Sequence, residues 1–319
     1  MAGPVADWQS LAAVTVGTLL ASASANTWNQ LYEVASDARM ARTRARPLPS
    51  GRISRQHATG FGLATAAGAA AVLAAGTNPL TTALGLGNIA LYSAVYTPLK
   101  KVTPWNTDVG AVVGAIPPLM GWAAATGTAL APGALAAAAL LHLWQMPHFY
   151  ALAWRHRADY AAGGYAMLSV TEPTGTAIGK WSLAHTAGLA ALPFLCVAGG
   201  VTSPMFAVCA APINAYALYT TAAFAKAPDD AGARRVFLWS LWYLPLMMGL
   251  MVFFSTEWGA GERGGGEHVG DARRALGQAL CPHETSRARP DEAQPAAELK
   301  AAACPATALE AAVKVAVAR

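Results

Sequence analysis

Long apolar segments alternate with shorter polar ones over the first 254 residues of the chain. Each apolar segment is near the length of about 20 residues that an α-helix needs to cross a bilayer. Several contain Gly or Pro, which membrane-spanning helices tolerate. The pattern predicts an all-α polytopic membrane protein with eight spans, at about residues 8–28, 58–76, 79–99, 108–126, 131–153, 181–199, 204–225 and 236–254.

The connections between these segments are of two kinds. Long, charged connections fall at 37–57, 100–107, 154–180 and 226–235, and short, uncharged ones fall around 77–78, 127–130 and 200–203. With eight spans, every charged connection lies on the same side of the membrane. All 14 Lys and Arg residues before position 255 lie in or beside them. The positive-inside rule therefore predicts that this side faces the cytoplasm or the mitochondrial matrix.

Composition supports the membrane assignment, since 55% of the residues are hydrophobic and only 12% are charged. Soluble domains usually carry about 25% charged residues. Four cysteines without a CxxC pair indicate neither a zinc site nor a disulfide framework. The basic residues are explained by topology, so no nucleic-acid partner is predicted. The chain divides into a transmembrane domain at 1–255 and a Gly-, Pro- and charge-rich segment at 256–319, which we expect to be a disordered tail.

Polar side chains cluster at the end of the first predicted helix. Asn29, Glu33 and Asp37 are spaced four residues apart and share one helix face. Carboxylate and amide oxygens in this arrangement are typical ligands for Mg²⁺, which binds carboxylates together with substrate phosphates. The alternative is an ordinary polar helix end. Carboxylates within a membrane span more often serve function, which favours the metal site.

Basic residues follow directly. Arg42 and Arg46 lie in an arginine-rich turn, and guanidinium groups bind phosphate oxygens in pairs. Lys100 and Lys101 lie in a third polar patch on the same side of the membrane. These four residues are candidates for binding a diphosphate. The alternative is that they only mark the positive side of the membrane.

A second cluster contains His148, Arg155 and Asp159, which share one face if the helix is continuous. Asp159 is the stronger candidate for function. His148 alone is as readily interpreted as a packed, hydrogen-bonded core residue.

These blocks resemble the UbiA superfamily of intramembrane prenyltransferases, and within it the mitochondrial type of the branch that makes haem O (protohaem IX farnesyltransferases). The resemblance spans residues 8–254. Asn29-x3-Glu33-x3-Asp37 is similar to the motif NxxxDxxxD, and residues 40–48 are similar to MxRTxxRPL. Residues 96–101, 114–122, 143–149 and 159–165 are similar to the later blocks, with His148 and Arg155 where quinone-type members carry aspartates.

The resemblance implies a UbiA-type helical bundle and a reaction. Farnesyl diphosphate ionises with the help of Mg²⁺, a vinyl group of haem b takes the farnesyl group, and water adds to give haem O for haem A and cytochrome c oxidase biogenesis. It implies a mitochondrial inner-membrane location with the charged loops in the matrix, and haem A synthase as a further partner. The residues that the resemblance implies as catalytic and metal-binding are Asn29, Glu33, Asp37 and Asp159, and those for substrate binding are Arg42, Arg46, Lys100, Lys101, His148 and Arg155.

Two departures and three alternatives accompany this interpretation. The family has nine spans, and this chain begins near the second and shows no targeting presequence. We therefore expect a truncated product that lacks one wall of the substrate cavity, with an inactive, assembly-type protein as one alternative. The second alternative is a UbiA-type prenyltransferase of quinone or chlorophyll pathways, which His148 disfavours. The third is a transporter, which the gathering of acids at one face disfavours.

Overall fold

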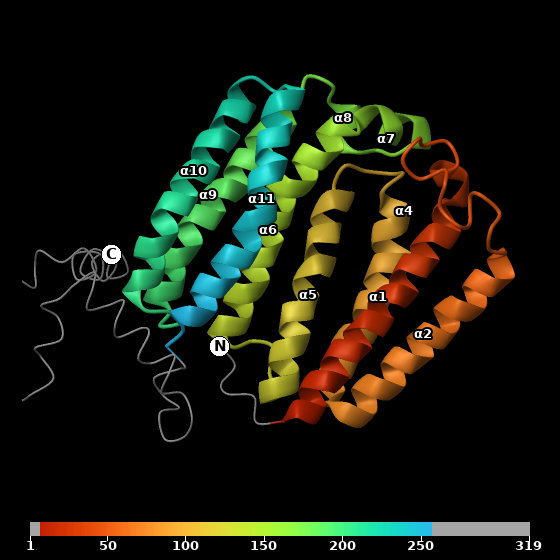
Figure 1. Cartoon of the computed structure of the whole chain (residues 1–319), viewed down its shortest axis with the longest axis horizontal. Coiled ribbons are helices and arrows are strands. Elements are labelled where there is room, and N and C mark those ends of the chain that lie inside the picture. The colour runs from red at the N-terminus through yellow and green to blue at the C-terminus, as the bar shows by residue number, and fades with distance from the viewer. Residues whose placement is uncertain (1–6, 257–319) are drawn as a thin grey trace, which may run out of the picture.

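The computed structural model describes residues 7–256, which form a bundle of helices (Figure 1). Its long helices match the predicted spans one by one, so the predicted all-α bundle is confirmed. They are α1 (Trp8–Asp37), α2 (Arg55–Gly76), α3 (Pro79–Ala90) with η1 (Leu91–Tyr96) and α4 (Thr97–Leu99), α5 (Asn106–Thr126), α6 (Pro132–Arg155), α9 (Thr176–Ala198), α10 (Pro204–Lys226) and α11 (Asp230–Phe253).

Four helices in the described part of the chain, α2, α5, α9 and α11, are both long enough and apolar enough to cross a membrane. The helices α1, α6 and α10 have 30, 24 and 23 residues, which also exceeds the length needed to span a bilayer. Large apolar side chains on the outside of the bundle stay exposed, for example Leu19 and Leu195, each 65% exposed. An apolar exterior of this kind is expected where lipid is the solvent. The protein is an integral membrane protein.

Side-chain caps define where several helices begin. Ser54 Oγ accepts from the His57 amide at the start of α2, and Asn78 Oδ1 accepts from the Thr81 amide at the start of α3. Such caps satisfy backbone N–H groups that have no partner within the helix. Gly127, with φ of 77°, ends α5 in the left-handed region that favours glycine. The Asn78 cap and Gly127 lie in the short connections, whereas the Ser54 cap lies at the opposite end of the bundle, where the charged loop after α1 meets α2.

The charged connections meet at one end of the bundle, as the sequence predicts (Figure 1). The loop after α1 lies there beside two short helices, α7 (Arg157–Gly163) and α8 (Leu168–Thr171). The predicted tail at 256–319 lies outside the described residues except for Thr256.

Two of the three apolar cores in the described residues join the long helices of the bundle. The larger one joins α6, α9, α10 and α11 around fully buried Trp239, Tyr243 and Phe206. The smaller one joins α1, α2 and α5 through Val14, Leu73 and Met120. Between these two halves runs the contact of α5 with α6, which borders the cavity described below.

Two of the predicted spans differ in detail from regular helices. The third is interrupted by the π-helical turn η1, and π-turns inside helices often mark functional sites. The fifth, α6, ends at Arg155, because His156 leaves helical geometry with φ of −110° and ψ of 21°. Arg157 stabilises this break by donating to the Trp154 carbonyl at 2.7 Å and pairing with Asp230. The prediction that Asp159 continues the His148 face of one helix is therefore wrong, and Asp159 lies on α7.

Candidate active site

The polar end of α1 is buried, although it consists of residues that usually face water. Asn29 is 6% exposed, Glu33 3% and Asp37 0%. Burying a carboxylate is costly unless it is paired with a charge or fully hydrogen-bonded. The partners of these groups therefore decide what the site can do.

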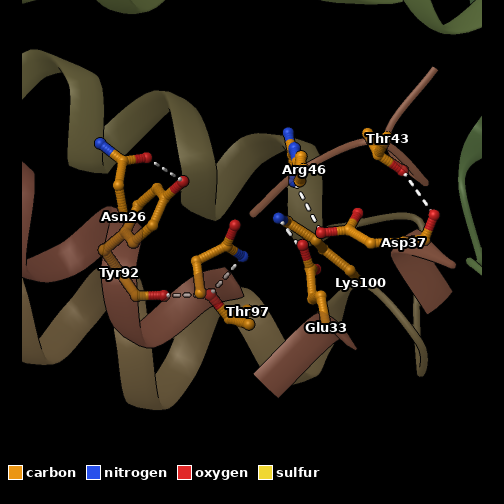
Figure 2. A network of polar contacts seen from close by, with 9 residues as sticks. Asn26, Glu33, Asp37, Thr43, Arg46, Tyr92, Thr97 and Lys100 are labelled. Atoms are coloured by element: carbon orange, nitrogen blue, oxygen red, sulfur yellow. Dashed lines mark hydrogen bonds and ion pairs between the residues drawn. The ribbon is translucent and has the colours of Figure 1, made fainter. Parts of the chain in front are cut away.

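Each carboxylate is paired with a cation from another segment (Figure 2). Lys100 Nζ lies 3.1 Å from Glu33 Oε1, and Arg46 Nη1 donates to Asp37 Oδ2 at 2.8 Å. Burial lowers the pKa of Lys100, and the Glu33 and Asp37 carboxylates oppose that shift. Two carboxylates and two cations from three segments thus form one charge network, which we call the acidic cluster (Glu33, Asp37, Arg46 and Lys100).

The acidic cluster leaves ligand-binding capacity unused. Asp37 Oδ1 is buried and has no hydrogen-bond partner in the described part of the chain. Glu33 Oε1 is buried and contacts Lys100 as an ion pair without hydrogen-bond geometry. Two underused carboxylate oxygens suit a hard cation such as Mg²⁺. Within residues 7–256, however, no three His, Cys, Asp or Glu side chains converge closely enough to hold a metal by themselves. A metal held here would complete its coordination with ligands from outside the protein, such as substrate oxygens or water.

Asn29 is engaged one turn further into the bundle. Its amide nitrogen donates to Thr97 Oγ1 at 3.1 Å, and that hydroxyl donates to the Tyr92 carbonyl at 2.9 Å (Figure 2). The Thr97 amide also donates to the Tyr92 carbonyl, five residues earlier, which is the shifted helical hydrogen bond of the π-turn η1. The π-turn thus positions a hydroxyl against the first polar motif, a contact that sequence periodicity does not reveal.

Asp159, from the second predicted cluster, lies at the same end of the bundle and contacts the loop that follows α1. Asp159 Oδ1 accepts from the Ala41 amide at 3.2 Å, and Arg39 Nη2 donates to the Gly163 carbonyl at 2.9 Å. The Arg42 guanidinium lies 5.8 Å from the ring centroid of Tyr160. Tyr165, in the connection after α7, has its hydroxyl pKa raised by burial and by the charges of Glu33 and Asp37. Asp159 and Arg42 therefore lie at the loop that also carries Arg46 of the acidic cluster.

His148 and Arg155 face a different neighbour, helix α11. The His148 ring stacks between Trp144 and Phe237 at 5.0 Å each, and His148 Nδ1 lies 2.8 Å from Ser240 Oγ. The Arg155 guanidinium is 5.5 Å from the Phe237 ring centroid. The single hydrogen bond at Nδ1 fixes the ring and leaves Nε2 without a partner among the described residues. Such a ring can bind a ligand through Nε2.

A cavity of about 250 Å³ lies between η1, α5 and α6. The acidic cluster adjoins its polar end, since Lys100 Nζ is 4.6 Å from the ring centroid of the lining residue Tyr96. The lining is mainly aromatic and aliphatic, with one amide. It consists of Tyr92, Tyr96, Thr107, Gly110, Ala111, Val113, Gly114, Gln145, Met146 and Phe149. An anionic head at the cations and an apolar tail in the cavity would fit this arrangement.

The structure thus brings together Glu33, Asp37, Arg46 and Lys100. Asn29, one turn away on α1, bonds to Thr97, and Asp159 bonds to the loop that contains Arg42. Lys101 is exposed beside Tyr32, at 5.3 Å from its ring centroid, and is not part of the acidic cluster. Sequence reasoning assigned no role to Thr97, Tyr165 or Gln145. An uncharged amide within an apolar span was the available signal for Gln145.

Comparison with known proteins agrees with this geometry. Residues 1–242 match the model of the UbiA prenyltransferase family. The human mitochondrial protoheme IX farnesyltransferase is 46% identical over 81% of this chain and 58% of its own length. The Opitutus terrae protoheme IX farnesyltransferase is 37% identical over 79% of this chain and 85% of its own length. This chain thus spans a little over half of the human relative that it matches.

A solved structure supports the fold assignment. A UbiA homologue from Archaeoglobus fulgidus, bound to GPP and Mg²⁺, superposes with a TM-score of 0.55 at 16% identity, covering 78% of this chain and 90% of that one. At this identity the likeness concerns the fold alone. Together with the family match over three quarters of the sequence and with the buried acidic cluster, it leads to one conclusion: the chain belongs to the UbiA prenyltransferase family.

Proposed function

We propose that this protein transfers the farnesyl group of farnesyl diphosphate to a vinyl group of haem b, with addition of water, to give haem O. The observation that carries the proposal is the acidic cluster next to an aromatic cavity, in a chain 46% identical to the human protoheme IX farnesyltransferase. The cations suit a diphosphate, and the cavity suits an isoprenoid tail.

The reaction breaks the bond between farnesyl C1 and the diphosphate oxygen, and diphosphate leaves with the electron pair. The vinyl π-electrons form the new carbon–carbon bond to C1. Water supplies hydroxyl to the resulting cationic carbon and releases one proton. Arg42, Arg46 and Lys100 would stabilise the charge that develops on diphosphate. The apolar lining would keep water away from the farnesyl cation before capture.

Glu33 and Asp37 would hold Mg²⁺, with Asn29 and Asp159 beside them. The unpartnered Asp37 Oδ1 and the absence of a third converging acid in the described residues both fit a metal completed by diphosphate oxygens. When bound, the ion supplies charge neutralisation for the leaving group. In its absence, Lys100 and Arg46 neutralise the two carboxylates, and both must give way when the metal and diphosphate bind.

His148 and Arg155 are the proposed contacts to haem. The fixed His148 ring, with Nε2 unengaged, could hold the haem iron or orient the macrocycle, and Arg155 could pair with a propionate. By likeness to the mitochondrial relatives, the protein works in the mitochondrial inner membrane with its charged loops in the matrix, and delivers haem O to haem A synthase.

The test is to incubate the full chain in liposomes with haem b, farnesyl diphosphate and Mg²⁺, and to identify the product by mass spectrometry. We expect haem O from the wild type and none from Asp37→Ala. Farnesylation of a quinone precursor or chlorophyllide in place of haem would refute the proposed acceptor. No transfer to any acceptor by a folded chain would refute the activity.

A further inference from the structure

The cavity between η1, α5 and α6 has a polar end beside Lys100 and an end further from the charges, which defines a direction for an occupant. Tyr96 and Thr107 lie at the polar end, next to Lys100 and the first turn of α5. Gly114 lies two turns further along α5, about 10 Å away at 1.5 Å per residue. A tail that enters from the acidic cluster therefore meets Gly114 last.

A side-chain contact between α6 and α5 lines that far end. Gln145 of α6 reaches across to α5, where its Nε2 donates to the Ala111 carbonyl at 3.2 Å, and it also donates to Leu141 at 3.0 Å. Its amide lies directly against Gly114, since a methyl group at that position would come within 2.6 Å of Gln145 Cδ. Only a glycine at 114 leaves room for the amide in its present place.

We infer that the contact between Gln145 and Gly114 sets the length of the isoprenoid chain that this protein accepts. This inference rests on the proposed function, in that the cavity receives the prenyl tail. The Gln145 amide limits the space for the tail at the far end of the cavity, and we call it the length stop. The missing side chain at Gly114 gives this amide room to lie against α5, outside the path of the tail. The Gln145 side chain is flexible, so a methyl at position 114 would displace its amide rather than the backbone. The free space next to the amide is the cavity, so the amide would move into it.

The inference predicts shifts in opposite directions at the two positions. Gly114→Ala drives the amide into the cavity, so the protein should bind geranyl better relative to farnesyl. Gln145→Ala removes the stop, so it should bind geranylgeranyl better relative to farnesyl. We expect each ratio to change by about 10-fold or more, as for differences of one to a few methylenes in an apolar pocket. The double variant should recover much of the wild-type preference for farnesyl.

The experiment measures binding of geranyl, farnesyl and geranylgeranyl thiolodiphosphates, which do not ionise readily, to the full chain in liposomes with Mg²⁺. Gly121→Ala is the matched control, because it lies on the same helix and a methyl there meets no atom within 4 Å. It should leave all three affinities unchanged. Since binding is measured without an acceptor, the result does not depend on haem.

The outcomes separate the two proposals. Opposite shifts for Gly114→Ala and Gln145→Ala support the length stop, even if the wild type makes no haem O, in which case only the proposed reaction fails. Equal loss of all three ligands in Gly114→Ala, or unchanged ratios in Gln145→Ala, would overturn the inference while leaving the reaction intact. A wild type that binds none of the three analogues overturns both.

Discussion

Lys100 offers the most direct test of the buried charge network. Its side chain is 12% exposed, and its ammonium pairs at 3.1 Å with Glu33, whose side chain is 4% exposed. Lys100→Met keeps an unbranched apolar chain over the Tyr96 ring but removes the charge. Glu33 is then left buried and uncompensated, which typically costs about 3–5 kcal/mol. For a helical region of this size, that corresponds to a fall in melting temperature on the order of 10 °C.

The assay is thermal unfolding in detergent without Mg²⁺, with Lys100→Met compared to the double variant Lys100→Met/Glu33→Gln. The double variant removes both charges, so we expect it to recover most of the lost stability. Equal melting temperatures for Lys100→Met and the wild type, or a double variant less stable than Lys100→Met, would contradict this account.

Three further predictions concern binding and packing. Arg46→Gln should weaken binding of farnesyl thiolodiphosphate at least 10-fold, whereas Arg44→Gln in the same loop, which is exposed, should change it less than twofold; calorimetric titration checks both. His148→Ala should lower the affinity for haem b in a spectrophotometric titration and leave binding of the prenyl analogue unchanged. Gly179→Ala should destabilise the bundle by about 1–3 kcal/mol, because the added methyl would come within 2.7 Å of the α10 backbone, while Gly60→Ala, with open space, should be neutral or stabilising in thermal unfolding.

The sequence by itself determined the order and approximate positions of the spanning helices, because hydropathy and the positions of charged loops depend only on local composition. It also placed Asn29, Glu33 and Asp37 on one face of one helix, because their spacing equals a little over one helical turn. The motif blocks likewise identified the family without any knowledge of packing.

Only the tertiary structure decided which charges meet. Lys100 and Lys101 are indistinguishable in sequence, yet Lys100 pairs with Glu33 inside the bundle and Lys101 is exposed, because packing of η1 against α1 and α5 turns one of them inward. The helix break at His156 could not be predicted from the sequence either, because Arg157 stabilises it by pairing with Asp230 of α11. The cavity and its stop depend on Gln145 and Gly114 of different helices. Contacts between residues far apart in the chain follow from how helices pack, and no local pattern records them.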